Sequence, residues 1–193
     1  MQAARGASLT SDSSTSHGLP AQRRRYLWLF AVVALLGYLA DLSSKMLAVA
    51  HLEPGRPVPV VGDLLTLYIA RNPGAAFSTG TSYTLGLSFI AMAAALAVVW
   101  NARRLGSVGW AIGLGFLLAG VLGNLTDRIF RRPGVLRGHV VDFLQLPHWP
   151  IFNLADVCIN VAAAFIIVQA LRGVSVSGAR HHSGSADHEA PTP

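Results

Sequence analysis

Four apolar stretches, each about as long as a membrane is thick, constrain the fold of this chain more than any other feature. They span residues 26–50, 82–101, 109–127 and 151–171, and few charges interrupt them. A helix needs roughly 20 apolar residues to cross the hydrocarbon core of a bilayer. Only 12% of the residues are charged, whereas a soluble domain usually carries about a quarter. We predict an all-α membrane protein with four transmembrane helices and a small extracytoplasmic, strand-containing region between the first two.

Polar tails flank the predicted membrane domain, residues 23–172. Residues 1–22 and 173–193 contain little that a core would bury, so both are predicted to be disordered. The first apolar stretch has an alternative interpretation as a cleaved signal peptide, with Ala48–Ala50 as the cleavage site. Asp41 and Lys45 break the apolar core that a signal peptide needs, which favours a retained helix.

Basic residues at the ends of the stretches predict the orientation. Arg23–Arg25 precede the first stretch, Arg103 and Arg104 follow the second, and Arg172 follows the fourth. With four crossings these residues share one side, and the positive-inside rule makes that side and both termini cytoplasmic. The net charge of +6 thus reflects helix flanks, and we expect no nucleic-acid binding. Four further arginines lie on the predicted outer side, where we expect them to serve a site: Arg128, Arg131, Arg132 and Arg137.

The third stretch carries a packing signal. Ala111, Gly115, Ala119 and Gly123 recur every four residues, which places small side chains along one helix face. Such a face allows two helix backbones to approach closely in lipid. Chance in a chain rich in Ala and Gly is the alternative explanation.

Polar residues gather at the predicted outer ends of the helices, where they are costly and usually functional. Asp41 and Lys45 are four residues apart and share a helix face, so we predict an ion pair. Leu64–Ile69 is predicted to be extended, and the loop after it contains Asn72 and Gly74. Three other residues share a face at the end of the third stretch: Asn124, Asp127 and Arg128. Asn153, Asp156 and Asn160 share a face at the start of the fourth.

Three carboxylates therefore converge between the third and fourth helices: Asp127, Asp142 and Asp156. Asp142 lies in the apolar tetrapeptide 140–143, which is typical of a short strand or a helix start. Two close carboxylates share one proton, so one can activate water while the other protonates a carbonyl oxygen. Spacing alone does not say which two form the pair.

A metal site, a transporter and an assembly factor are the alternatives to a hydrolase. Carboxylates alone favour Mg²⁺ or Ca²⁺, but no His-x-x-Glu-His spacing occurs, and the single cysteine, Cys158, excludes a multi-cysteine metal site. We expect no metal and no cofactor. A proton-coupled transporter would need carboxylates at the middle of the membrane. A non-catalytic assembly factor would use the polar residues only to join helices.

Five motifs in series resemble the lipoprotein signal peptidases (signal peptidase II). They are Asp41-Leu-Ser-Ser-Lys45, Asn72-Pro-Gly-Ala-Ala-Phe77, Gly123-Asn-Leu-Thr-Asp-Arg128, Val140-Val-Asp-Phe143 and Phe152-Asn-Leu-Ala-Asp156. The resemblance covers residues 26–171. Two departures concern loops: the stretch from Asp127 to Asp142 is longer than the family pattern and contains Arg131-Arg-Pro-Gly134, and the stretch from Asp142 to Asp156 is shorter.

The resemblance implies an aspartic endopeptidase of the bacterial cytoplasmic membrane, with Asp142 and Asp156 as catalytic residues at the outer face. Its implied substrate is a prolipoprotein carrying diacylglycerol on the lipobox cysteine, cleaved just before that cysteine. We expect a monomer in contact with membrane lipid. Residues implied to bind substrate or support the site are Asp41, Lys45, Asn72, Gly74, Asn124, Asp127, Arg128, Asn153 and Ala155.

Overall fold

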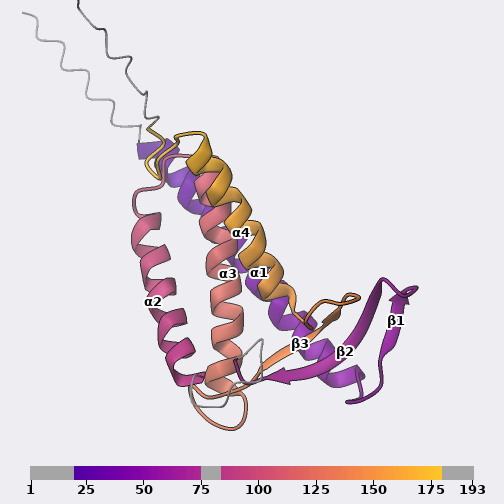
Figure 1. The fold of residues 1–193 in the computed structure, drawn as a ribbon. Helices are drawn as coiled ribbons and strands as arrows, with labels where there is room; N and C mark the ends of the chain where they lie inside the picture. The colour runs from indigo at the N-terminus through magenta and orange to yellow at the C-terminus, as the bar shows by residue number, and fades with distance from the viewer. Residues whose placement is uncertain (1–19, 75–83, 180–193) are drawn as a thin grey trace, which may run out of the picture.

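Four apolar helices and a three-stranded sheet make up the structure, a computed structural model that describes residues 20–74 and 84–179. The elements are α1 (Pro20–His51), β1 (Val58–Val61), β2 (Leu65–Asn72), α2 (Thr84–Ala102), α3 (Val108–Phe130), β3 (Val140–Gln145) and α4 (Leu154–Leu171). Within these residues, all four helices are long and apolar enough to cross a membrane. The predicted helical membrane fold is confirmed (Figure 1).

Helix α3 is the centre of the bundle. It packs against α4, α1 and α2, and 56% of its most apolar part is buried, against 17–22% in the other helices. The helices lie side by side with the sheet at one end (Figure 1). We call this the sheet end. At the opposite end, the tail end, α1 begins and α4 finishes.

The small-residue face of α3 packs against α1, as its spacing predicted. A methyl group added to Gly115 would lie 2.9 Å from Val33 Cβ of α1, which is closer than two carbon atoms that are not bonded to each other normally approach. One turn further along α3, Ala119 is fully buried against Gly37 of α1. The two backbones therefore approach closely where both side chains are small. This contact fixes α1, which carries Asp41 and Lys45, against α3.

The sheet has the antiparallel order β1-β2-β3. Its first two strands lie between α1 and α2, as predicted, whereas β3 comes from the loop between α3 and α4. Ala70 of β2 lies opposite Asp142 of β3, and Asn72 lies opposite Val140. The pairing thus joins the two loops of the sheet end and brings Asp142 to the strand that carries Asn72.

Several predicted boundaries differ from the structure. Helix α1 begins at Pro20, inside the predicted N-terminal tail, and α4 begins at Leu154 because Asn153 caps it. Residues 173–179 of the predicted C-terminal tail form turns against the α2–α3 connection, where Gly106 N donates to Val176 O at 2.9 Å. Trp110 Nε1 of α3 donates to Val174 O at 2.8 Å. These turns close the tail end of the bundle. Residues 1–19 and 180–193, and Ala75–Phe77 of the second motif, lie outside the described residues.

Candidate active site

Asn153 holds the start of α4 and two of the predicted carboxylates. Its side chain accepts a hydrogen bond from Asp156 N, while Asp156 Oδ2 accepts one from Asn153 N, both at 3.1 Å. This reciprocal capping satisfies two backbone N–H groups that the first helical turn leaves free. Asn153 Nδ2 also donates to Asp142 Oδ1 at 2.6 Å. One buried amide thus fixes Asp142 and Asp156 relative to each other.

Asp142 is almost completely buried, at 3% exposure. Its second oxygen, Oδ2, accepts a hydrogen bond from Asn72 Nδ2 at 3.0 Å. The Asn72 side chain is itself held by Gly74, whose N–H donates to Asn72 Oδ1 at 2.8 Å. Gly74 has a φ of +120°, which glycine adopts readily and other residues do not. This turn therefore aims the Asn72 amide at Asp142.

Burial raises the pKa of Asp142 from 3.8 to about 6. Loss of water around the charged form is the largest cause, and the nearby charge of Asp156 raises the pKa further. Hydrogen bonds from Asn72 and Asn153 act in the opposite direction but do not outweigh burial. Asp142 therefore holds a proton more readily than an exposed aspartate does.

Asn124 of α3 connects Asp156 to the interior. Its Nδ2 donates to Asp156 Oδ1 at 2.9 Å, and its Oδ1 accepts hydrogen bonds from Lys45 Nζ at 3.0 Å and Asn153 Nδ2 at 3.2 Å. Because the Lys45 ammonium and the Asn153 Nδ2 group can only donate, they orient the Asn124 carbonyl toward themselves and its amide nitrogen toward Asp156. Asp156 thus receives a donor whose direction is set by neighbouring residues.

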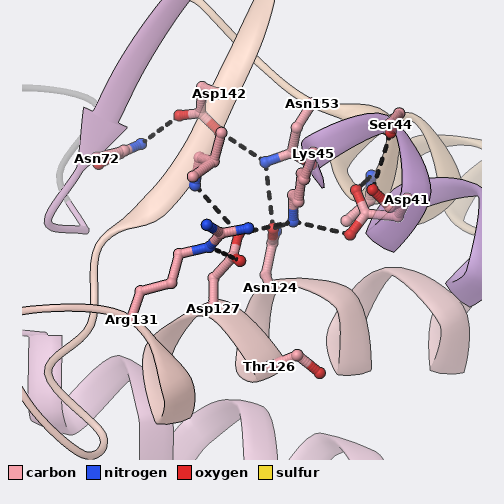
Figure 2. Close-up of polar contacts among 12 residues, drawn as sticks. Asp41, Ser44, Lys45, Asn72, Asn124, Thr126, Asp127, Arg131, Asp142 and Asn153 are labelled. Atoms are coloured by element: carbon pink, nitrogen blue, oxygen red, sulfur yellow. Dashed lines mark hydrogen bonds and ion pairs between the residues drawn. The ribbon is translucent and has the colours of Figure 1, made fainter. Parts of the chain in front are cut away.

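Lys45 is the only lysine of the chain, and its side chain is buried to 1% exposure. Its ammonium lies 2.8 Å from Asp41 Oδ2 and 3.1 Å from Asp127 Oδ2 (Figure 2). The same ammonium also donates a hydrogen bond to Asn124 Oδ1 at 3.0 Å. The predicted Asp41–Lys45 pair is therefore present, and Asp127 of α3 forms a second ion pair with the same ammonium.

Asp127 is occupied by structural contacts. Besides Lys45, its Oδ2 accepts a hydrogen bond from Val141 N of β3 at 3.1 Å, and Arg131 Nε contacts Oδ1. The carboxylate is 2% exposed. It thus ties α1, α3 and β3 together, and both of its oxygens are engaged by protein donors.

Asp41 links α1 to α4. Its Oδ1 accepts a hydrogen bond from Ala155 N at 2.8 Å, which satisfies another free N–H in the first turn of α4. Ala155 is fully buried and packs beside Gly123 of α3. The predicted role of Ala155 in supporting the site thus has a backbone basis.

Arg128 lies beside this network but does not join it by a hydrogen bond among the described residues. Its Nη1 is buried without a partner there. A methyl group on Gly74 would lie 3.2 Å from that atom, which places the guanidinium against the Asn72–Gly74 turn. Arg128 thus presents a buried donor near Asp142.

One supporting contact escaped the sequence prediction. The sequence predicts that Arg131 serves a site but does not name Asp127 as its partner, although the two are four residues apart, a spacing that favours ion pairs on helices. The bond from Val141 N to Asp127 carries no side-chain signal, so only the tertiary structure reveals it. Among the described residues, no group of three or more His, Cys, Asp or Glu side chains is arranged to hold a metal ion.

The helices and their polar cluster define a multi-pass membrane protein with a site built at one end of the bundle. A bacterial membrane enzyme solved by the in meso method at 1.9 Å resolution has a similar fold, with a TM-score of 0.66 and 25% identity over 74% of this chain and 92% of that chain. The family described as signal peptidase (SPase) II matches residues 33–172.

Two relatives are identical to this chain at nearly half of the aligned positions. The lipoprotein signal peptidase of Rhodococcus jostii is 46% identical over 170 residues, 88% of this chain and 84% of the relative. That of Mycobacterium avium is 45% identical over 163 residues, 84% of this chain and 88% of the relative. The chain therefore belongs to the signal peptidase II family, and it is a peptidase.

Lys45→Met should destabilise the fold strongly, because it leaves Asp41 and Asp127 buried without their shared cation. Removing one partner of a buried ion pair typically costs about 3–5 kcal/mol. We expect a large drop in the thermal unfolding midpoint of the purified protein in detergent.

Arg56→Gln is the matched control, since it breaks the Arg56–Glu53 pair, whose side chains are 76% and 68% exposed. Exposed pairs contribute about 0–1 kcal/mol, so its unfolding midpoint should stay unchanged. Equal midpoints for both variants would contradict a structural role for Lys45.

Proposed function

We propose that this peptidase is a membrane-embedded aspartic endopeptidase in which Asp142 and Asp156 form the catalytic pair. It would remove the signal peptide from prolipoproteins that carry diacylglycerol, cutting just before the lipidated cysteine. The observation that carries the proposal is Asn153, whose side chain and backbone hold both carboxylates. The third candidate, Asp127, is paired with two cations, Lys45 and Arg131, whereas the hydrogen bonds to the Asp142 and Asp156 carboxyls come from neutral amides. Elimination within the cluster and family membership thus favour the same pair.

Different surroundings suggest different roles for the two carboxyls. Asp142, with its pKa raised to about 6, is proposed as the protonated member that donates to the substrate carbonyl. Asp156 receives two donors, Asn124 Nδ2 and Asn153 N, and lies in the first turn of α4, where the helix dipole favours negative charge. It is proposed as the base that takes a proton from water.

Water addition by this pair needs no further cofactor. Asp156 would accept one proton as the water oxygen attacks the scissile carbonyl, while Asp142 would protonate the carbonyl oxygen. As the C–N bond of the resulting diol breaks, Asp156 would pass its proton to the departing amide nitrogen, and one diol hydroxyl would return a proton to Asp142 as the new carboxylic acid forms. All proposed groups come from one chain, so a monomer would suffice.

Replacing either carboxyl by an amide should abolish cleavage. Asp142→Asn and Asp156→Asn keep the side-chain volume but remove the shared proton, and we expect turnover of a lipidated preprotein to fall by at least roughly 10³-fold, by analogy with other catalytic-group deletions. The measurement is cleavage by each purified variant in lipid or detergent, with unfolding midpoints recorded alongside.

Two further substitutions interpret the result. Asp63→Asn, at an exposed carboxylate between β1 and β2, should keep full activity. Asp127→Asn should lower the unfolding midpoint more than it lowers the activity of the folded fraction. Near-normal turnover by Asp142→Asn or Asp156→Asn would exclude the proposed pair.

The pH profile tests the assignment of acid and base. Since the pKa of Asp142 is raised to about 6, the proton that the reaction needs is present below that pH and is lost above it. We expect kcat/KM to fall about tenfold per pH unit above a midpoint near 6. Bound lipid that displaces water should raise the pH at which kcat falls to half of its maximum. A profile without a basic limb between pH 5 and 9 would contradict Asp142 as the acid.

We also propose that the tail end faces the cytoplasm and that the sheet end, with the site, faces outward. Arg23–Arg25, Arg104 and Arg172 all belong to the tail end, as the positive-inside rule favours. In a Cys158→Ala background, Val60→Cys should react with an impermeant thiol reagent in intact cells. Arg104→Cys should react only after permeabilisation; the reverse pattern would invert the orientation.

A further inference from the structure

A basic hollow lies at the sheet end beside the site, and Arg131, which contacts Asp127, is common to both. It has a volume of about 820 Å³ and is open to the surface. Its lining residues are Arg71, Phe130, Arg131, Arg132, Pro133 and His139. Four of them, Arg131, Arg132, Pro133 and His139, come from the long connection between α3 and β3.

The positive charge of the hollow is only partly balanced by the part of the chain that the structure describes. Arg131 is paired with Asp127, but Arg71 and Arg132 form no ion pair with any described residue. The segment 75–83 contains no acidic residue, and neither does the connection 131–139. Two exposed guanidinium groups and an imidazole therefore converge on one opening without a carboxylate among them. Guanidinium groups bind phosphate and carboxylate oxygens in paired fashion.

The walls of the hollow are held in place by backbone hydrogen bonds. His139 N donates to Arg132 O at 3.0 Å, and Gly138 N donates to Arg128 O at 2.9 Å. From α2, Ser88 Oγ donates to Leu136 O at 2.7 Å. The connection is thus a folded segment attached to two helices, and its basic side chains start from fixed positions.

The surroundings of the hollow place it at the level of lipid headgroups. Phe130, the last residue of the membrane-spanning helix α3, is 80% exposed, and Val135 in the connection is 73% exposed. Apolar side chains this exposed are stable when lipid covers them. Basic groups directly beyond the end of a membrane-spanning helix meet the phosphates of the bilayer, because that is where the polar headgroups begin.

We propose that this hollow binds the headgroup of an anionic membrane phospholipid, with Arg71 and Arg132 on the phosphodiester. The site goes beyond the peptidase function and does not depend on the Asp142–Asp156 pair. Its location would place an ordered lipid next to the loop that leads from Asp127 to Asp142. The source is the surrounding bilayer rather than a soluble anion, because Phe130 and Val135 offer apolar contact to the attached glycerol and acyl chains.

A local fluorescence measurement tests the proposal. A bimane label on Gly134→Cys, in a Cys158→Ala background of the full chain, reports on the connection, since nothing lies within 4 Å of a side chain added at Gly134. The labelled protein is placed in phosphatidylcholine nanodiscs that contain either phosphatidylglycerol or phosphatidylcholine with a nitroxide near the headgroup. We expect nitroxide phosphatidylglycerol to be enriched at the label about tenfold over nitroxide phosphatidylcholine, from two arginines near an anionic headgroup.

Variants and competitors separate the possible ligands. Arg71→Gln with Arg132→Gln should bring the enrichment ratio to about one, whereas Arg56→Gln and the tail-end Arg104→Gln should leave it unchanged. Equal quenching by both lipids in the unsubstituted hollow would overturn the proposal. So would loss of the enrichment with low concentrations of inorganic phosphate, which would indicate a soluble anion. Displacement by a peptide rich in Asp and Glu at similarly low concentration would assign the hollow to an acidic protein segment instead.

Discussion

The buried ammonium of Lys45 is the contact on which the rest of the site depends. It joins Asp41 of its own helix to Asp127 and Asn124 of α3. A charge in a membrane interior is stable only when opposite charges and hydrogen bonds surround it, so the position of α1 against α3 is fixed where these groups meet. The small side chains at Gly115 and Ala119 permit that approach. Without them, Lys45 would not reach its partners on the central helix.

The three partners of Lys45 connect it to β3 and to two residues of α4. Asp127 accepts from Val141 N and so fixes the strand on which Asp142 is the next residue. Asp41 accepts from Ala155 N and fixes the first turn of α4, where Asp156 follows. Asn124 donates to Asp156 directly. The two carboxyls of the proposed pair are thus reached through three separate routes from one cation, which explains why so many polar side chains surround so small a site.

Much of this arrangement was accessible from residue spacing. The four helices, the Asp41–Lys45 pair and the small-residue face of α3 follow from periodicity, because each is a relation within a single helix. The extension of residues 64–69 was also predicted, and residues 140–143 were predicted to be either a short strand or a helix start. The pairing of β2 with β3 was not predicted, because the two segments are about 70 residues apart and neither sequence indicates which strand it pairs with. The helix start at Asn153 was missed by a few residues, because apolar Ile151 and Phe152 continue the pattern of the helix.

The three carboxylates show what the sequence can predict and what needs the tertiary structure. By itself, the sequence determined that this is a helical membrane protein with a carboxylate cluster at one end, because composition and period depend only on local order. It did not separate Asp127 from Asp142 and Asp156 except through family resemblance. Only the tertiary structure decided what surrounds each carboxylate: Asp127 lies against Lys45, Arg131 and a backbone N–H, while Asn153 bridges the other two. The role of a carboxylate depends on its neighbours in space, and those come from other parts of the chain.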